Sequence, residues 1–268
     1  MTPQQFRNVV WKYYREHGRH TLPWRKTKDP YKILVSEMML QQTQVERVKA
    51  YYQAWLKQFP TVDALAEAPL GEVLRAWQGL GYNSRAKRLQ GTAKVIAKNG
   101  GRFPKTPEGL QALPGIGPYT ARAVMAFAHN ADVVFIETNI RTAVTHHFFP
   151  KKKQIDDKEL LPILEKALPE GNAREWYAAL MDYGAHLKRS GVKLNVKAKG
   201  YTKQAKFGGS AREARGAILK ELTKHSATRV RLLGLLGDDR QEQVGLQLEK
   251  LLGEGMVAKR GKNFSLPA

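Results

Sequence analysis

The chain has 268 residues, with 45 Lys and Arg against 24 Asp and Glu, so its formal charge is +21 and its isoelectric point is near 10.1. This length suggests one large domain or two ordinary ones. The charge points to polyanionic partners such as nucleic acid or an anionic membrane. No segment approaches the roughly 20 apolar residues of a spanning helix, and the N-terminus lacks the apolar core of a signal peptide. We therefore expect a cytoplasmic protein with no membrane partner.

Cysteine is absent, which excludes disulfides, cysteine nucleophiles, thiolate zinc sites and ordinary iron–sulfur clusters. His146 and His147 are adjacent, so on a helix they point in different directions and do not suit one metal ion. We expect no metal site.

Apolar residues recur at three-to-four spacing from the N-terminus to about Lys188, while alternating β-branched runs are scarce. This pattern predicts a mainly α-helical body. The first helix places Val9, Val10, Tyr13 and Tyr14 on one stripe. Further helices are predicted at 45–59, 70–78, 84–99, 120–129, 139–149, 157–167 and 174–188.

From Lys188 to Arg212 the chain is rich in lysine and has no acidic residue. Such a run is either a solvated linker or a phosphate-binding segment. Tyr201 and Phe207 place aromatic faces among the charges, as single-stranded nucleic acid binders do. Both interpretations stay open on composition alone.

A second unit is predicted after Ser210, which could cap its first helix. Helices are expected at 212–224, 228–236 and 239–253, the last capped by Asp238-Asp239, and residues 256–266 alternate around a glycine turn as a β-hairpin does. Three helices and a hairpin resemble a winged helix. Such units contact DNA or dock onto proteins.

The string Leu110-Gln-Ala-Leu-Pro-Gly-Ile-Gly-Pro-Tyr-Thr-Ala121 is the strongest local motif. Two glycines around one apolar residue allow a tight turn whose backbone N–H groups point outwards at the start of the next helix. Such amides suit a phosphate oxygen, held directly or through a monovalent cation. The string resembles the helix-hairpin-helix motif of DNA-binding proteins.

A second motif runs from Leu22-Pro-Trp-Arg25 to Ser36-Glu-Met-Met-Leu-Gln-Gln-Thr-Gln-Val45. Glu37 sits among apolar neighbours, where burial would raise its pKa and let the carboxylic acid deliver a proton near neutral pH.

With Gly79-Leu-Gly-Tyr82 and Phe135-Ile-Glu-Thr-Asn-Ile-Arg141, these strings resemble the helix-hairpin-helix (HhH-GPD) DNA glycosylase superfamily, and within it the adenine glycosylases of the MutY type. The match runs from about residue 3 to about residue 187. The resemblance implies a two-lobed helical body at 1–187, with one lobe at 22–130 and the other at 1–21 and 131–187. A basic linker at 188–209 and the winged-helix-like domain at 210–268 complete the expected organisation.

The resemblance also implies a mechanism, in which the target nucleotide is flipped out of duplex DNA at an unstacking cost of a few kcal/mol. Glu37 would protonate the base, Glu137 would stabilise the sugar's positive charge, and Tyr119 and Asn139 would orient them. Leu22, Trp24 and Arg25 match the base-pocket segment. The residues expected to contact DNA are Gln41, Gln42, Tyr82, Gly115, Gly117, Thr120, Lys197, Lys199 and Lys203.

Tyr119 stands where bifunctional relatives such as endonuclease III carry a lysine that attacks the sugar and allows strand cleavage. A phenol cannot form that Schiff base. We therefore expect a monofunctional enzyme that leaves an abasic site.

The chain departs from the resembled pattern at three places. Glu137 replaces an aspartate, and a displacement of about 1 Å can cost roughly 100-fold in rate. The cysteines of the usual iron–sulfur cluster are replaced by the lysine-rich stretch, so we expect no cluster and no other cofactor. The winged-helix-like unit stands in place of a Nudix-like domain that reads 8-oxoguanine.

The sequence therefore predicts a monomeric base-excision-repair glycosylase, acting at the nucleoid, that removes adenine mispaired with guanine or 8-oxoguanine. One alternative is a thymine or uracil mismatch glycosylase acting opposite guanine. The other is a DNA-binding protein that finds lesions but is catalytically silent because of Glu137.

Overall fold

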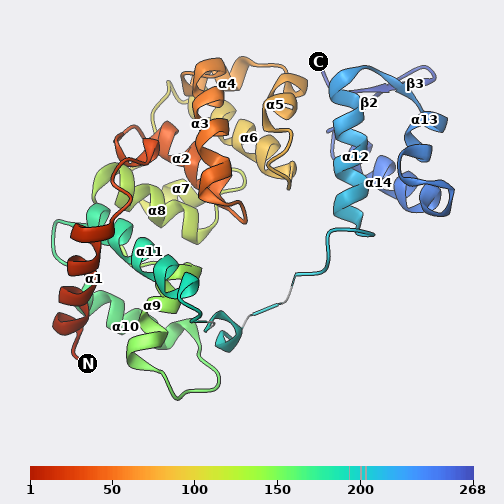
Figure 1. The fold of residues 1–268 in the computed structure, drawn as a ribbon. Coiled ribbons are helices and arrows are strands. Elements are labelled where there is room, and N and C mark those ends of the chain that lie inside the picture. The colour runs from red at the N-terminus through yellow and green to blue at the C-terminus, as the bar shows by residue number, and fades with distance from the viewer. Residues whose placement is uncertain (193, 200, 203) are drawn as a thin grey trace. The chain divides into compact units, whose positions relative to one another are not determined.

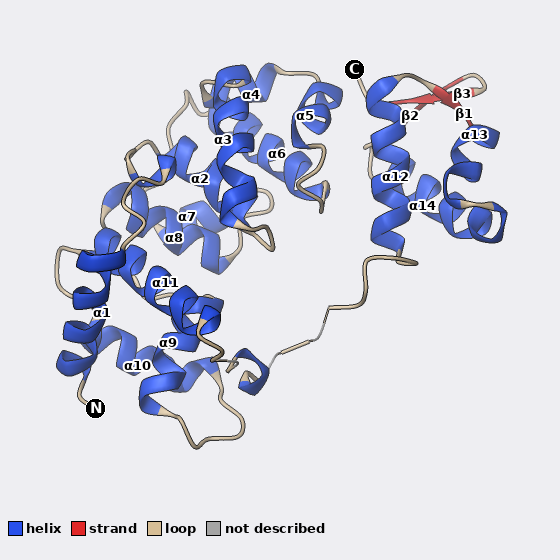
Figure 2. Ribbon diagram, in the orientation of Figure 1, coloured by secondary structure: helices blue, strands red, loops and turns tan. Residues whose placement is uncertain are grey.

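The computed structural model describes residues 1–192, 194–199, 201–202 and 204–268. Most of the described chain is helical and its few strands are short (Figure 2), which confirms the predicted mainly α-helical class. The chain folds into two compact units. Unit 1 comprises Met1–Glu37, Phe103–Ala112 and Ile116–Lys203, and unit 2 comprises Met38–Arg102, Leu113–Gly115 and Gln204–Ala268. The domain boundaries expected from the sequence stay a prediction.

None of the described helices has the length and apolar character needed to cross a bilayer.

Unit 1 is built around α11, which packs against α1, α8 and α9. Its core contains the fully buried rings of Phe6, Trp176 and Tyr177. The long N-terminal helix starts at a capping box in which Thr2 and Gln5 satisfy each other's backbone amides. Its elements (Figure 1) are α1 (Pro3–His17), η1 (Pro23–Arg25), α7 (Pro107–Gln111), α8 (Pro118–His129), α9 (Thr138–Phe148), α10 (Asp157–Ala167), α11 (Ala173–Arg189) and η2 (Asn195–Lys197).

Helix α2 (Pro30–Leu40) begins in unit 1 and ends in unit 2. Every residue from Ile33 to Met39 is buried, including Glu37. A helix buried on all sides has no polar face, so its sequence shows no helical periodicity. The sequence patterns consequently did not predict this helix.

Unit 2 contains a group of helices and a small α/β module. The elements of the first group are α3 (Val45–Gln58), α4 (Val62–Glu67), α5 (Leu70–Trp77) and α6 (Ser84–Lys98). The elements of the module are α12 (Ala211–Lys224), β1 (Ala227–Thr228), α13 (Arg229–Leu233), η3 (Gly234–Leu236), η4 (Asp238–Arg240), α14 (Gln241–Gly253), β2 (Ala258–Arg260) and β3 (Asn263–Ser265).

The module has the element order of a winged helix. Its antiparallel sheet has the strand order β1-β3-β2, with Phe264 opposite both Ala227 and Lys259. Ser210 caps α12 by accepting the Glu213 amide, as predicted. The predicted cap of α14 was wrong, because Asp238 and Asp239 form the preceding 3₁₀ turn and the N-cap is Arg240, whose side chain accepts no hydrogen bond from the first-turn amides.

A buried ion network in unit 1 fixes the segment before α2. Asp182 on α11 is 2 % exposed and accepts two bonds from the guanidinium of Arg25, at 2.7 and 2.8 Å. It also accepts hydrogen bonds from the backbone amide and the side chain of Arg19, both at 2.7 Å. Burial alone would raise the pKa of Asp182, but the two arginines hold it below its usual value.

Replacing Asp182 by Asn should destabilise the protein by about 3 kcal/mol, because removing one partner of a buried pair leaves charge without compensation. The free energy of unfolding in urea measures this loss. Glu46→Gln is the control, since the Glu46–Lys49 pair is exposed and such pairs contribute less than about 1 kcal/mol. Equal effects for both variants would contradict a structural role for the Asp182 network.

Candidate active site

The first carboxyl group of the site is Glu37, near the end of α2. It is 6 % exposed and accepts a hydrogen bond from the Tyr119 hydroxyl, 2.9 Å away, near the start of α8. Burial raises the pKa of Glu37 to about 7; the bond from Tyr119 lowers it and the charge of Glu137 raises it. Glu37 can therefore donate a proton near neutral pH.

The second carboxyl group, Glu137, is the N-cap of α9. Its Oε1 atom accepts the backbone amides of Asn139 and Ile140, at 2.8 and 2.9 Å. Its Oε2 atom accepts the Thr138 hydroxyl at 3.0 Å and the Asn139 side-chain amide at 3.2 Å. The glutamate side chain thus folds back onto its own helix, where the N-terminal amides and dipole stabilise a negative charge.

The four predicted catalytic residues lie in unit 1, where hydrogen bonds and the interaction between the two carboxyl groups connect them. Burial raises the pKa of Tyr119, and the charges of Glu37 and Glu137 raise it further, so the phenol stays protonated as a donor. Glu37 is buried among apolar groups, while Glu137 is held by amides. Two carboxyl groups in such different surroundings suit different roles, one as a proton donor and one as a fixed anion.

The predicted base-pocket residues lie in and beside η1. Leu22 and Trp24 are 4 % and 9 % exposed, so both side chains belong to the core. Arg25 is bound by Asp182 and also donates to the carbonyl oxygen of Ala178, at 3.2 Å. In the described structure these side chains hold the segment in place, and their contact with a base stays a prediction.

The turn between α7 and α8 has the geometry expected of the glycine motif. Gly115 has φ +78°, and a Cβ there would lie 2.6 Å from the Cβ of Arg88, so a larger residue would be both strained and crowded. Gly117 is exposed and is the N-cap of α8. Thr120 is buried, so the structure does not expose its side chain for the predicted contact with DNA.

Three of the residues expected to contact DNA, Gln41, Gln42 and Tyr82, lie on two loops of unit 2. Gln42 and Tyr82 have φ +55° and +48°, a left-handed conformation that is strained for such residues and is typical of functional sites. Tyr82 is 37 % exposed, and its hydroxyl receives a bond from Arg212 at 2.8 Å. Gln41 is partly buried.

Arg85 is a residue that sequence reasoning missed, and it joins those two loops. It is 5 % exposed and donates to the carbonyl oxygens of Met38, in the last turn of α2, and Gln41, on the loop after it, and to those of Leu80 and Gly81 on the other loop, at 2.6–3.1 Å. Burial lowers its pKa to about 10, so the guanidinium stays charged. Nothing in the string around Arg85 distinguishes it from an exposed arginine.

The basic segment after α11 is attached to the body by main-chain bonds. Ile155 donates to the carbonyl of Lys197 at 2.8 Å, and the amide of Lys199 donates to Ile155 at 2.9 Å. The Lys197 ammonium binds the carbonyl of Pro150, while Lys199 is exposed and lies 3.7 Å from Asp156. Lys203 lies outside the described residues.

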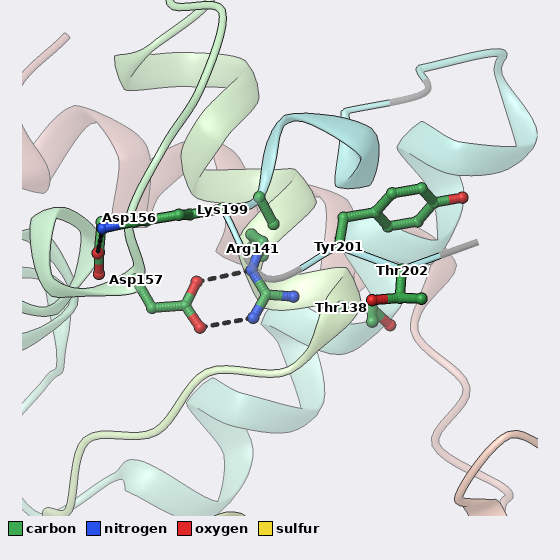
Figure 3. A pocket seen from close by; sticks show the side chains of 8 residues that line it. Thr138, Arg141, Asp156, Asp157, Lys199, Tyr201 and Thr202 are labelled. Carbon is green, nitrogen blue, oxygen red and sulfur yellow. Dashed lines mark hydrogen bonds and ion pairs between the residues drawn. The ribbon is translucent and has the colours of Figure 1, made fainter. Parts of the chain in front are cut away.

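A cavity of about 720 Å³ opens between this segment and the starts of α9 and α10. Figure 3 shows Arg141 in a paired contact with Asp157 and the ring of Tyr201 above the start of α9. The cavity is lined by Thr138, Arg141, Asp156, Asp157, Ala198, Lys199, Tyr201 and Thr202. Among the described residues, two cationic and two anionic side chains line the cavity, so its net charge does not favour binding of an anion.

The profile of the HhH-GPD superfamily of base excision DNA repair proteins matches residues 35–170, which include all four residues of the site. The chain belongs to this superfamily. Within it, the chain is 37 % identical over 199 residues to the adenine DNA glycosylase of Buchnera aphidicola subsp. Baizongia pistaciae, covering 73 % of this chain and 57 % of the relative. It is 44 % identical over 175 residues to that of Mycolicibacterium smegmatis, covering 63 % and 59 %.

This HhH-GPD chain thus spans less than two thirds of the length of those two relatives. Among solved structures, a thermostable thymine-DNA glycosylase superposes with a TM-score of 0.63 and 28 % identity, covering 68 % of this chain and 86 % of that one. The predicted family and helical glycosylase fold are confirmed.

The buried Glu37 gives this HhH-GPD protein a pH-dependent stability. Its pKa is about 7 when folded against 4.5 in its ordinary state, so ionisation destabilises the folded state progressively between those values, by about 3 kcal/mol in full. Glu37→Gln should therefore have a higher Tm than the wild type at pH 8, and this advantage should vanish near pH 4. Thermal scans at both pH values measure it, and a pH-independent difference would contradict a buried carboxylate.

Proposed function

We propose that this protein is a monofunctional DNA glycosylase that hydrolyses the N-glycosidic bond of adenine mispaired with guanine or 8-oxoguanine. The observation that carries the proposal is the hydrogen bond from Tyr119 to a buried Glu37 whose pKa lies near 7. The adenine DNA glycosylases to which the chain is similar supply the choice of base.

The geometry supports a two-carboxylate reaction like that of glycoside hydrolysis. A flipped adenine would take the proton of Glu37 on a ring nitrogen, which makes the base a better leaving group. Positive charge then develops on the sugar, and Glu137 supplies a fixed negative charge to stabilise it. After the base leaves, the Glu37 carboxylate can accept a proton from the attacking water. Tyr119 keeps Glu37 oriented, and its phenol provides no amine for a Schiff base.

Glu137 is longer by one methylene than the aspartate of the resembled pattern. The structure shows how a glutamate fits here, because both of its oxygens are engaged at the start of α9. A side chain held at both oxygens can keep its charge in place, so we propose that Glu137 supports catalysis.

The four-cysteine iron–sulfur cluster that the family commonly carries does not fit this chain, which has no cysteine. The segment where it would lie is instead bonded through its main chain to Ile155. We expect purified protein to be colourless and to contain less than about 0.1 iron atoms per chain by elemental analysis, since iron–sulfur clusters are held by Cys thiolates. Stoichiometric iron that survives gel filtration would contradict this.

A single-turnover assay tests the function directly. Duplexes would carry adenine opposite 8-oxoguanine, guanine or cytosine, and thymine or uracil opposite guanine, each followed by alkaline cleavage. We expect adenine release from the first two duplexes, a loss of at least about 100-fold in Glu37→Gln because the general acid is removed, and no covalent adduct with borohydride.

The other outcomes separate the alternatives. The likeness to a thymine-DNA glycosylase favours thymine or uracil opposite guanine as the second candidate substrate, and release of those bases alone would select it. Tight binding without release of any base, with activity restored by Glu137→Asp, would identify a silent lesion-binding protein.

We further propose that the enzyme acts as a monomer on duplex DNA, in the cytoplasm at the nucleoid. The charge of +21 supports attraction to phosphate. The exposed glycine turn before α8 supports backbone contact.

A further inference from the structure

Lys188, in the last turn of α11, makes a contact that the proposed reaction does not explain. Its ammonium donates to the side-chain oxygen of Asn139 at 2.7 Å, and the amide nitrogen of Asn139 donates to Glu137 at 3.2 Å. A chain of polar contacts therefore runs from α11 to the carboxylate. Lys188 is half-buried.

The backbone of α11 brings Lys188 to this position. Gly184 lies one turn earlier on the same face of the helix, and a Cβ there would lie 2.9 Å from the Cα of Asn139 and closer still to its carbonyl group. Only glycine lets α11 and α9 approach so closely. This approach places the ammonium of Lys188 over the first turn of α9.

We propose that Lys188 is a positioning residue for the glycosylase reaction, which orients the Asn139 amide and through it the Glu137 carboxylate. This inference rests on the proposed function. An asparagine side chain can present either its oxygen or its NH₂ group to a neighbour. Because Lys188 occupies the oxygen, the NH₂ group faces Glu137.

Without Lys188, the Asn139 amide could rotate and bring its oxygen against the carboxylate, which would repel it. Glu137 would lose a donor to the oxygen that is not bound by backbone amides. Burial lowers the pKa of Lys188, the charge of Glu137 raises it and that of Arg141 lowers it. The neighbouring Lys197 and Lys199 instead contact a carbonyl and an aspartate outside the four-residue site.

Single-turnover rates and DNA affinities of the full chain separate this role from phosphate binding. Lys188→Met should lower the rate on the order of 10- to 100-fold, as small misplacements of reacting groups do, while the Kd for a duplex with non-hydrolysable 2′-fluoro-adenosine changes less than about threefold. Lys188→Arg should restore most of the rate. Lys153→Met is the control, because it removes an equal charge from an exposed position.

A double-mutant cycle shows whether Lys188 acts through Asn139. We expect Lys188→Met to have no further effect in an Asn139→Ala background. Additive losses, an unchanged rate in Lys188→Met, or a rate that falls in parallel with DNA affinity would each overturn the proposal.

A measurement without substrate tests the role of Lys188 separately from the proposed glycosylase activity. The side-chain amide resonances of Asn139, assigned by their loss in Asn139→Ala, should shift in Lys188→Met and stay in place in Lys153→Met. If the wild type released no base from any duplex, the proposed function would fail, and the NMR comparison would still decide the role of Lys188. Unshifted resonances would overturn it.

Discussion

The direct backbone contact between α11 and α9 at Gly184 determines where the anionic half of the site lies. Because no side chain separates the two helices there, the first turn of α9 is held against α11, the helix around which unit 1 is built. Glu137 caps that turn, Asn139 lies within it, and Lys188 reaches it from one turn further along α11. The position of the carboxylate thus depends on main-chain packing as well as on side-chain bonds.

The same helix also anchors the segment that leads into α2. Asp182 binds Arg19 and Arg25, and so fixes η1 before the chain enters the buried helix that carries Glu37. Both carboxyl groups of the site therefore depend on α11, one through packing and one through an ion network. Interiors are close-packed and transmit strain, so a change in α11 should alter both groups together.

The grouping of the candidate site residues was easier to predict from the sequence than the structure around them. Glu37, Tyr119, Glu137 and Asn139 stand in short strings that resemble those of the glycosylase superfamily, and the structure places the four side chains close together. Helices with one apolar face were predictable, whereas α2 was not, since burial on all sides removes the periodic signal.

Residues whose partners are distant in sequence were missed for a different reason. Asp182 lies 157 positions from Arg25 in the sequence. The two side chains meet only in the folded protein, so no local sequence pattern indicates their interaction. Lys188 was assigned to a basic run by composition, although its ammonium binds inside the protein. Gly184 carries no local turn signal, because its role is to be small where another helix passes.

The distribution of charge bears on which part of the chain suits the proposed contact with DNA. Residues 188–209 hold seven Lys and Arg and no acid, whereas residues 210–268 hold eleven against seven Asp and Glu. Several arginines of the winged-helix-like module are paired internally, including Arg215 with Glu254 and Arg240 with Glu213.

The exposed side of α14, the helix that reads the major groove in DNA-binding winged helices, carries Glu242 and Leu246. Phosphate contact depends on cations that replace counterions, so the excess positive charge of residues 188–209 suits the proposed DNA contact better than α14 does. Lys188 begins that segment but uses its charge at Asn139. Among the described lysines of the run, the ammonium of Lys188 binds within the candidate site whereas that of Lys199 is exposed beside Asp156, a difference that composition cannot show.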